Sequence, residues 1–387
     1  MLSLILAAKL FSSDLAAQDQ QQQLNRLSIN ATFVSQVNPI SNFDIIHYLT
    51  PMDAPKESPL KEWKFSYLSM ALCQPLEQPS PTARIRVFSN TRDRQDADDI
   101  SQWVARYMGR LWNYLYFRCD IDHNARWGRL VDIYLTNEGD PARDGQAGSA
   151  QINQYDSQDL DSADRPTPRA NIYVFKISEA KRGIQLSREL AHEYGHALLP
   201  YATGFEKPES YPNGDLGERI FLSFIRDDLK AGKLTSEDII FTSQTDLDSY
   251  YRAKVQPHVT RIAASGPDFK LFTETNEKAY FEWVGIGTYL SRICPPMLFA
   301  RYVNLCTKVA ADSELAITSA AEERETWQLT IPDELKGKPL YIPLVKGKVT
   351  NAKILQKSGN WAKIQPEPGK IVTIKNPPLP PSNQNLK

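Results

Sequence analysis

Two histidines four residues apart, with a glutamate directly after the first, are the residues of this chain whose types and spacing can do chemistry. They are His192, Glu193 and His196, within the run 188–199. Residues four apart lie on one face of a helix, so both imidazoles can bind the same metal ion. Neutral imidazole is a good zinc ligand, and the neighbouring carboxylate can take a proton from a metal-bound water. The pattern predicts a hydrolytic zinc site.

The residues around this motif predict a helix that is buried on one side. Leu190, Tyr194 and Leu198 recur every four residues and form an apolar stripe, which argues against the alternative of a surface helix with two solvated histidines. Gly195 costs roughly 1 kcal/mol relative to alanine in a helix interior. A small residue there lets another backbone or a substrate approach closely.

The third metal ligand is less clearly marked. A catalytic zinc usually has three protein ligands and one open position. A third histidine at the spacing His-Glu-x-x-His-x-x-Gly-x-x-His would fall on Ala202. Glu218 begins the next predicted helix and is the expected ligand, although Asp215 and Glu218 also fit a capping box that would hold the first turn of that helix. Glu206, Glu209 and Asp215 remain rival ligands.

The segments on either side of the motif predict a mixed sheet followed by helices. The order before it is β-α-β-β-β-α, with a weak, exposed strand at 149–153. The expected elements are a strand at 83–88, a helix at 96–117, strands at 131–135, 149–153 and 171–177, helices at 245–264, 276–293 and 296–311, and short strands between 340 and 375. His47 and His123 have no partner at ligand spacing and are interpreted as structural or surface residues. The acidic run 156–164 is interpreted as a solvated loop rather than a calcium site.

Composition limits the classes of protein that this chain can belong to. Of its 387 residues 41% are hydrophobic, enough for a sizeable core. The 45 basic and 46 acidic side chains give a formal charge of -1. The chain as a whole therefore has no excess of positive charge that would indicate binding to nucleic acid or to an anionic membrane. No apolar run is long enough to span a bilayer. The four cysteines show no C-x-x-C spacing, so they do not predict a metal or redox site.

These patterns together predict five regions in an α+β chain. The short apolar run at the start favours a signal peptide, and so a secreted or periplasmic protein, over a frayed amphipathic segment. The predicted regions are a signal peptide and glutamine-rich spacer (1–25), an N-terminal β extension (26–80), a catalytic unit (81–325), a small C-terminal β module (326–376) and a disordered tail (377–387). Nothing in the sequence indicates an oligomeric state.

The motif residues resemble those of the gluzincin metallopeptidases, the thermolysin-like and aminopeptidase-like zinc enzymes. His192, Glu193, His196 and Glu218 match the family pattern, and the preceding element order is similar to the family's upper subdomain. The resemblance implies an α+β zincin fold with a Zn²⁺ ion, a cleft between a sheet subdomain and a helical one, and a peptide or protein substrate that pairs with the exposed strand. Some members carry an acidic residue that orients the first histidine where Leu222 stands here.

The resulting hypothesis is a zinc metallopeptidase with Glu193 as general base. Family members place a tyrosine or histidine of the helical half near the oxyanion, and the expected residues are Tyr280 and His258, with Tyr250 and Tyr251 as further candidates. The alternative is a catalytically inactive zincin-like protein that binds or adheres through its β modules.

Overall fold

The computed structural model describes residues 43–49, 69–75, 84–90, 94–119, 130–136, 145–149, 169–177, 183–199 and 202–378, and structural statements below concern these residues. Some predictions fall outside them: the signal peptide and spacer, much of the N-terminal β extension 26–80, His123, the acidic loop 156–164 and the tail from 379. Export of the protein therefore stays a prediction.

The chain divides into two compact units. The first comprises Met1–Asn113, His123–Ser187 and Gly232–Thr242, and the second Tyr114–Asp122, Arg188–Ala231 and Ser243–Lys387. All residues of the metal site discussed below belong to the second unit.

A six-stranded sheet forms the first unit, with the strand order β1-β2-β3-β4-β6-β5. The pairs β3–β4 and β4–β6 are parallel, while β1, β2 and β5 run antiparallel to their neighbours. The strands are β1 (Phe43–Leu49), β2 (Ser69–Pro75), β3 (Arg84–Asn90), β4 (Leu130–Thr136), β5 (Gly145–Ser149) and β6 (Arg169–Val174). Because β2 pairs with β3, the predicted N-terminal extension contributes its strands to this sheet.

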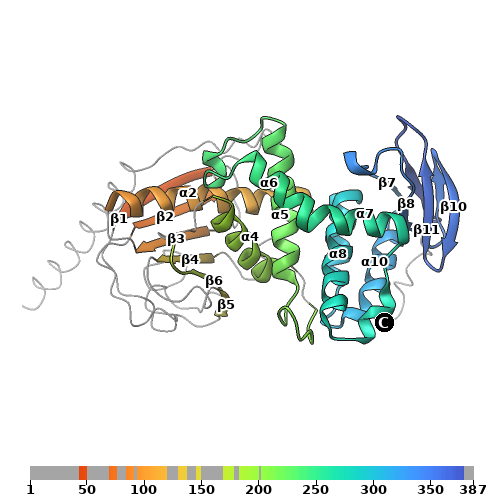
Figure 1. The fold of residues 1–387 in the computed structure, drawn as a ribbon, viewed down its shortest axis with the longest axis horizontal. Helices are drawn as coiled ribbons and strands as arrows, with labels where there is room; N and C mark the ends of the chain where they lie inside the picture. Colours follow the sequence, from red (N-terminus) through yellow and green to blue (C-terminus); the bar gives the residue numbers. More distant parts are fainter. Residues whose placement is uncertain are drawn as a thin grey trace, which may run out of the picture. The chain divides into compact units, whose positions relative to one another are not determined.

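Helix α2 (Arg94–Asn113) packs along β1, β2 and β3 (Figure 1). Its apolar residues recur at helical spacing, and Val104 and Leu111 are fully buried. The hydroxyl of Tyr107 donates a hydrogen bond to the Ser187 carbonyl oxygen at 2.6 Å, which fastens α2 to the first turns of the motif helix.

The second unit is mainly helical up to residue 322. Helix α5 packs on α6 and α8, α7 packs on α8, and α9 packs on α10. The helices are α4 (Ile184–Leu198), α5 (Asn213–Lys230), α6 (Gln244–Tyr250), α7 (Gln256–Ser265), α8 (Glu277–Ile293), α9 (Pro296–Leu305) and α10 (Ser313–Glu322). Asn276 caps α8, because its side-chain oxygen accepts a hydrogen bond from the Ala279 amide.

Two small antiparallel sheets make up the C-terminal β module, residues 326–378 (Figure 1). One has the order β10-β11-β8 and the other β7-β12-β9. The strands are β7 (Thr326–Gln328), β8 (Leu340–Pro343), β9 (Lys348–Thr350), β10 (Ala352–Ser358), β11 (Trp361–Pro366) and β12 (Thr373–Lys375). The Tyr289 hydroxyl of α8 donates to the Tyr341 carbonyl oxygen at 2.6 Å, so the module is anchored on the helices.

The prediction of an α+β fold is confirmed, since the described chain mixes helices with small sheets. Helix α10 and the strands β2, β7 and β9 were not predicted. Among the described residues, no helix combines the length and apolar character needed to cross a membrane.

Candidate metal centre

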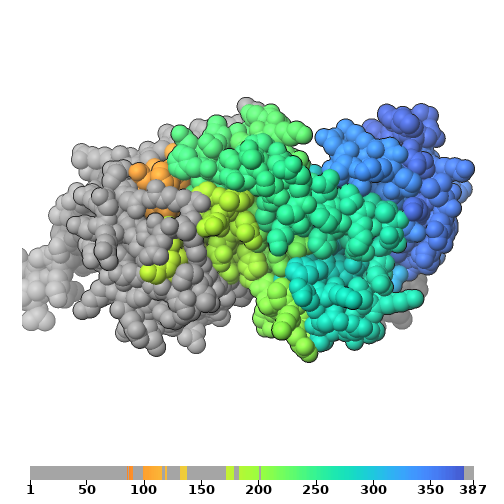
Figure 2. Space-filling view, viewed as in Figure 1, coloured from red at the N-terminus to blue at the C-terminus, as the bar shows by residue number. Residues whose placement is uncertain are grey.

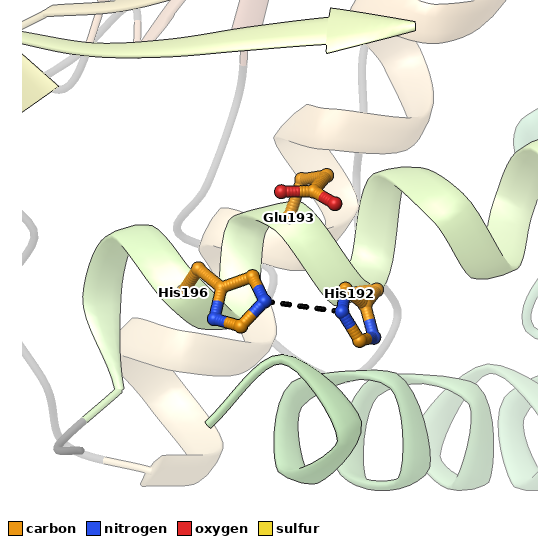
Figure 3. A group of neighbouring side chains, drawn as sticks. All are labelled: His192, Glu193 and His196. Carbon is orange, nitrogen blue, oxygen red and sulfur yellow. Dashed lines mark hydrogen bonds between the residues drawn. The ribbon is translucent and has the colours of Figure 1, made fainter. Parts of the chain in front are cut away.

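The motif helix α4 presents both histidines from one side. Leu190, Tyr194 and Leu198 are fully buried, as the apolar stripe predicts, and this fixes the rotation of the helix. His192 and His196 are partly exposed, and their Nε2 atoms lie 3.1 Å apart (Figure 3). Figure 3 shows the Glu193 side chain leaving the helix on a different side from the two imidazoles.

A third ligand group comes from the loop 202–212, between α4 and α5. Glu209 Oε2 lies 3.4 Å from Nε2 of His192 and 3.5 Å from Nε2 of His196. Burial would raise the pKa of Glu209, but the two imidazoles and the Tyr280 hydroxyl hold it well below its ordinary value. Glu209 is therefore an ionised carboxylate that faces both ring nitrogens.

The separations of these three atoms fit the face of a metal-ligand tetrahedron. Bonds of about 2.0–2.1 Å to a tetrahedral zinc place neighbouring ligand atoms about 3.3–3.4 Å apart. The three observed separations are 3.1, 3.4 and 3.5 Å. Two imidazoles and one carboxylate also form a donor set typical of catalytic zinc. The residues thus fit a zinc ion by chemistry and by spacing.

Gly214 leaves the space in front of the two histidines open. A Cβ atom at this position would lie 2.4 Å from Nε2 of His196 and 2.5 Å from Nε2 of His192. Any side chain at 214 would clash with both Nε2 atoms, so only glycine fits beside the two histidines.

Asn213 fixes the orientation of His196. Its Oδ1 atom lies 2.9 Å from Nδ1 of His196, and its Nδ2 donates to the carbonyl oxygens of Gly195, His196 and Leu199 at the end of α4. With Nδ1–H donating to Asn213, the lone pair of His196 lies on Nε2. The Asn213 side chain thereby caps the C-terminal end of α4 and sets the tautomer of His196.

Glu218 lies on the other side of His192 from the position that a third ligand would need. Its Oε2 is 3.6 Å from Nδ1 of His192, while its Oε1 accepts a hydrogen bond from Arg188 Nε at 2.6 Å. Burial would raise the pKa of Glu218, but His192 and Arg188 lower it below its ordinary value. The structure thus places Glu218 as the carboxylate that orients the first histidine, the role for which the sequence offered only Leu222.

A different grouping of ligand atoms does include Glu218. Ligand atoms of His192, Asp215 and Glu218 lie within 4.8 Å of one another, as do those of His192, Glu193 and His196. The group with Glu218 leaves out the second histidine of the motif. The group formed by His192, His196 and Glu209 keeps both histidines of the motif and adds a carboxylate that faces both Nε2 atoms, so these three residues could hold a metal ion.

The capping-box alternative for Asp215 and Glu218 is wrong. Helix α5 begins at Asn213, three residues earlier than that alternative requires, and its N-cap residue Pro212 makes no side-chain hydrogen bond. Glu218 therefore lies beyond the first turn, where no unpaired amide of the helix start is within its reach.

Glu193 is buried beside the two histidines and has an unused oxygen. Its side chain is 4% exposed, and Oε2 has no hydrogen-bond partner. Burial raises the pKa of Glu193 to about 7, although His192 and His196 act in the opposite direction. A carboxylate whose pKa lies near neutrality can both accept and return a proton.

Tyr280 is brought to the site in a different role from the one predicted. Its side chain is fully buried, and its hydroxyl donates to Glu209 Oε1 at 2.7 Å and lies 2.9 Å from Asp215 Oδ2. The hydroxyl therefore fixes the Glu209 carboxylate, which faces both imidazoles. Nearby, Tyr250 lies under the Arg188 guanidinium at 5.4 Å.

His258 packs between α7 and α8. A Cβ atom on Gly285 would lie 3.0 Å from its Nδ1, and its ring lies 6.2 Å from that of Phe281. Tyr251 donates its hydroxyl proton to Glu334. Neither contact set brings His258 or Tyr251 to the two histidines.

Helices α4 and α5 cross at glycines, which brings the ligands within reach of each other. A Cβ atom on Gly195 would lie 2.4 Å from the Asn213 carbonyl oxygen and 2.9 Å from the Cα atom of Gly217. The prediction that Gly195 admits another backbone is confirmed. This contact places Asn213 and Gly214 directly against the motif.

No protein-family model matches the sequence, and no curated protein or solved structure matches it significantly. The assignment of the site therefore depends on its own geometry.

Proposed function

We propose that the chain is a zinc metallopeptidase of the zincin type, with His192, His196 and Glu209 as ligands and Glu193 as general base. The observation that carries this proposal is the triangle of three ligand atoms with edges of 3.1, 3.4 and 3.5 Å. The ligand types are those of the gluzincins, but the glutamate comes from a loop and the expected Glu218 orients His192.

When bound, zinc supplies an activated water and polarises the substrate carbonyl. Glu193 accepts the proton of that water through its buried, unpartnered oxygen and donates it to the leaving amine. Its raised pKa, about 7, suits both transfers at neutral pH. His192, His196 and Glu209 would hold the ion; Asn213 and Glu218 face the Nδ1 atoms of the two histidines and so leave their Nε2 atoms available, and Tyr280 keeps Glu209 in place.

The proposed substrate is a peptide or protein. Two histidines and one glutamate are a ligand set of catalytic zinc in metallopeptidases, and Glu193 lies beside the two histidines as the base that peptide hydrolysis requires.

Metal content and proteolysis measured on the same preparation test the proposal. We expect stoichiometric zinc and chelator-sensitive cleavage of an unfolded protein substrate. Glu193→Gln should keep zinc and lose about 10²- to 10⁴-fold in turnover, because the positioned base is gone. The matched control is Glu189→Gln, the same chemical change one turn earlier on α4, which should leave turnover unchanged.

Two results would contradict the proposal. Zinc binding without any cleavage of peptides or proteins would favour the inactive binding protein. Activity of Glu193→Gln within about tenfold of the parent would remove the assigned base.

A further inference from the structure

The C-terminal β module carries a charge that the whole-chain balance conceals. Residues 326–378, all described, contain nine lysines, no arginine and three acidic residues, a formal charge of +6, whereas the whole chain has -1. The earlier exclusion of an anionic partner depended on the average over the whole chain. It does not hold for this module taken by itself.

Two of the lysines are paired directly across neighbouring strands. The register of β9 and β12 places Lys348 opposite Lys375, and Val349 opposite Ile374. Ile374 is buried, so the two lysines lie together on the opposite, exposed face. Like charges at directly opposed positions destabilise a sheet. An anion bound between them would remove that repulsion.

Strand β10 continues this surface as the edge of the other sheet. All its residues after Ala352 are exposed, and its register with β11 places Ile354 and Lys357 on the same face. The turn before it is joined to the segment before β12, because Asn351 Nδ2 donates to the Ile371 carbonyl oxygen at 2.8 Å. We call these residues the basic surface: Lys348, Ile354, Lys357, Ile371 and Lys375. The blue part of Figure 2 shows the module that carries it.

The other side chains of the module indicate which anion fits. Its three aromatic residues, Trp327, Tyr341 and Trp361, are buried, so none is available to stack on a nucleotide base. Arginine, which grips single phosphates with two parallel hydrogen bonds, is absent. Large aliphatic side chains are exposed instead, with Ile354 at 38% and Ile371 at 61%.

We propose that the basic surface docks the protein reversibly on an anionic phospholipid bilayer. Lysines near a membrane surface are attracted by its negative potential, and exposed aliphatic side chains enter the boundary between headgroups and acyl chains. The proposal is independent of the metal site, since none of its residues contacts the ligands.

Co-sedimentation of the full chain with vesicles tests this docking. We expect binding to phosphatidylcholine vesicles that contain phosphatidylglycerol, none to pure phosphatidylcholine, and loss of binding as salt is raised. Lys348→Glu/Lys375→Glu should weaken binding at least about tenfold. The matched control is Lys270→Glu/Lys278→Glu, which makes the same charge change at exposed positions of the helical part and should bind like the parent.

Ile371→Ser, at an exposed position of the basic surface, provides a second variant that keeps the charge of the module unchanged. It should weaken binding to vesicles without changing retention on heparin. The proposal would be overturned if the parent protein ignored anionic vesicles, if both double variants lost binding equally, or if DNA or heparin bound while vesicles did not.

Discussion

The carboxylates around the two histidines differ from the lysines of the C-terminal β module in how their charges are surrounded. Glu218 is buried and Glu209 is half-buried, and each of their oxygens faces a named ring nitrogen, hydroxyl or guanidinium. Lys348 and Lys375 are exposed and face each other. We therefore expect the exact positions of the charged groups to matter at the candidate metal site, whereas the total charge should matter on the basic surface. Substitutions should act abruptly at the metal site and gradually on the basic surface.

The largest effect is expected at Glu209, measured against Glu218. Glu209→Ala removes a ligand atom and should abolish stoichiometric zinc binding. Glu218→Ala removes only the group that orients His192, which typically costs about 10- to 100-fold in metal affinity. Chelator competition on both variants, with melting temperatures measured in parallel, gives the comparison. If Glu218→Ala released zinc while Glu209→Ala kept it, Glu218 would be the ligand and the geometric assignment would be wrong.

Gly214→Ala should remove the metal with little loss of fold. Its methyl group would lie 2.4–2.5 Å from both Nε2 atoms, and the partly exposed imidazoles would have to turn away. Gly217→Ala makes the same change three residues along α5, where the methyl group would lie 2.5 Å from the Gly195 Cα atom. That variant should lose about 1–3 kcal/mol of stability, because two backbones must separate. If both variants lost zinc equally and were destabilised equally, Gly214 would have no specific role at the metal site.

His258 should make the helical part less stable in acid. Burial lowers its pKa from 6.5 to about 4, and Arg219 of α5, Arg261 of α7 and Lys254 act in the same direction. The unfolded chain then binds more protons between these pH values, so the contribution is complete above pH 6.5 and is lost as the pH falls toward 4. Allowing for partial exposure, it is worth about 1 kcal/mol.

Melting temperatures of the parent and of His258→Gln, measured from pH 7 to pH 4, test this expectation. The stability difference between them should change only within the window stated above. A difference that stays constant with pH would mean that the His258 ring titrates normally in the folded protein.

The smallest effect is expected from a single lysine of the opposed pair. Lys348→Thr should stabilise the module by about 0.2–1 kcal/mol at low salt, since it removes a like-charge pair. The gain should shrink as salt screens the repulsion. Urea midpoints at two salt concentrations give the measurement, and a loss of stability at low salt would show that the two side chains do not repel.

Periodicity predicted the long elements well. The apolar stripes of α2, α4 and α8 and the central strands β3, β4 and β6 are found close to the expected bounds. Helix α10 was missed because its buried face consists largely of alanines, such as Ala316 and Ala320, which give little hydrophobic contrast. Strand β9 has only three residues, too few for an alternating pattern to stand out.

The ligands on one helix could be predicted, whereas the ligand from the loop could not. His192 and His196 are related by helical geometry alone, so their spacing defines their positions. Glu209 lies in an irregular segment whose path depends on the crossing of α4 and α5. It was kept as a rival ligand, but its local sequence contains nothing that distinguishes it from Glu206.

The close contact of α4 and α5 at their glycines extends the short motif into a longer sequence pattern that can identify homologous proteins. Because Gly195, Asn213, Gly214 and Gly217 are each required by a specific close approach, they should change together with the ligands. The pattern His-Glu-x-Gly-His, twelve residues, Glu, three residues, Asn-Gly, two residues, Gly describes this arrangement in the printed sequence. A distant relative that shares little else should retain it as a unit, and a protein designer who grafts only the five-residue motif onto another helix would obtain two histidines without a metal.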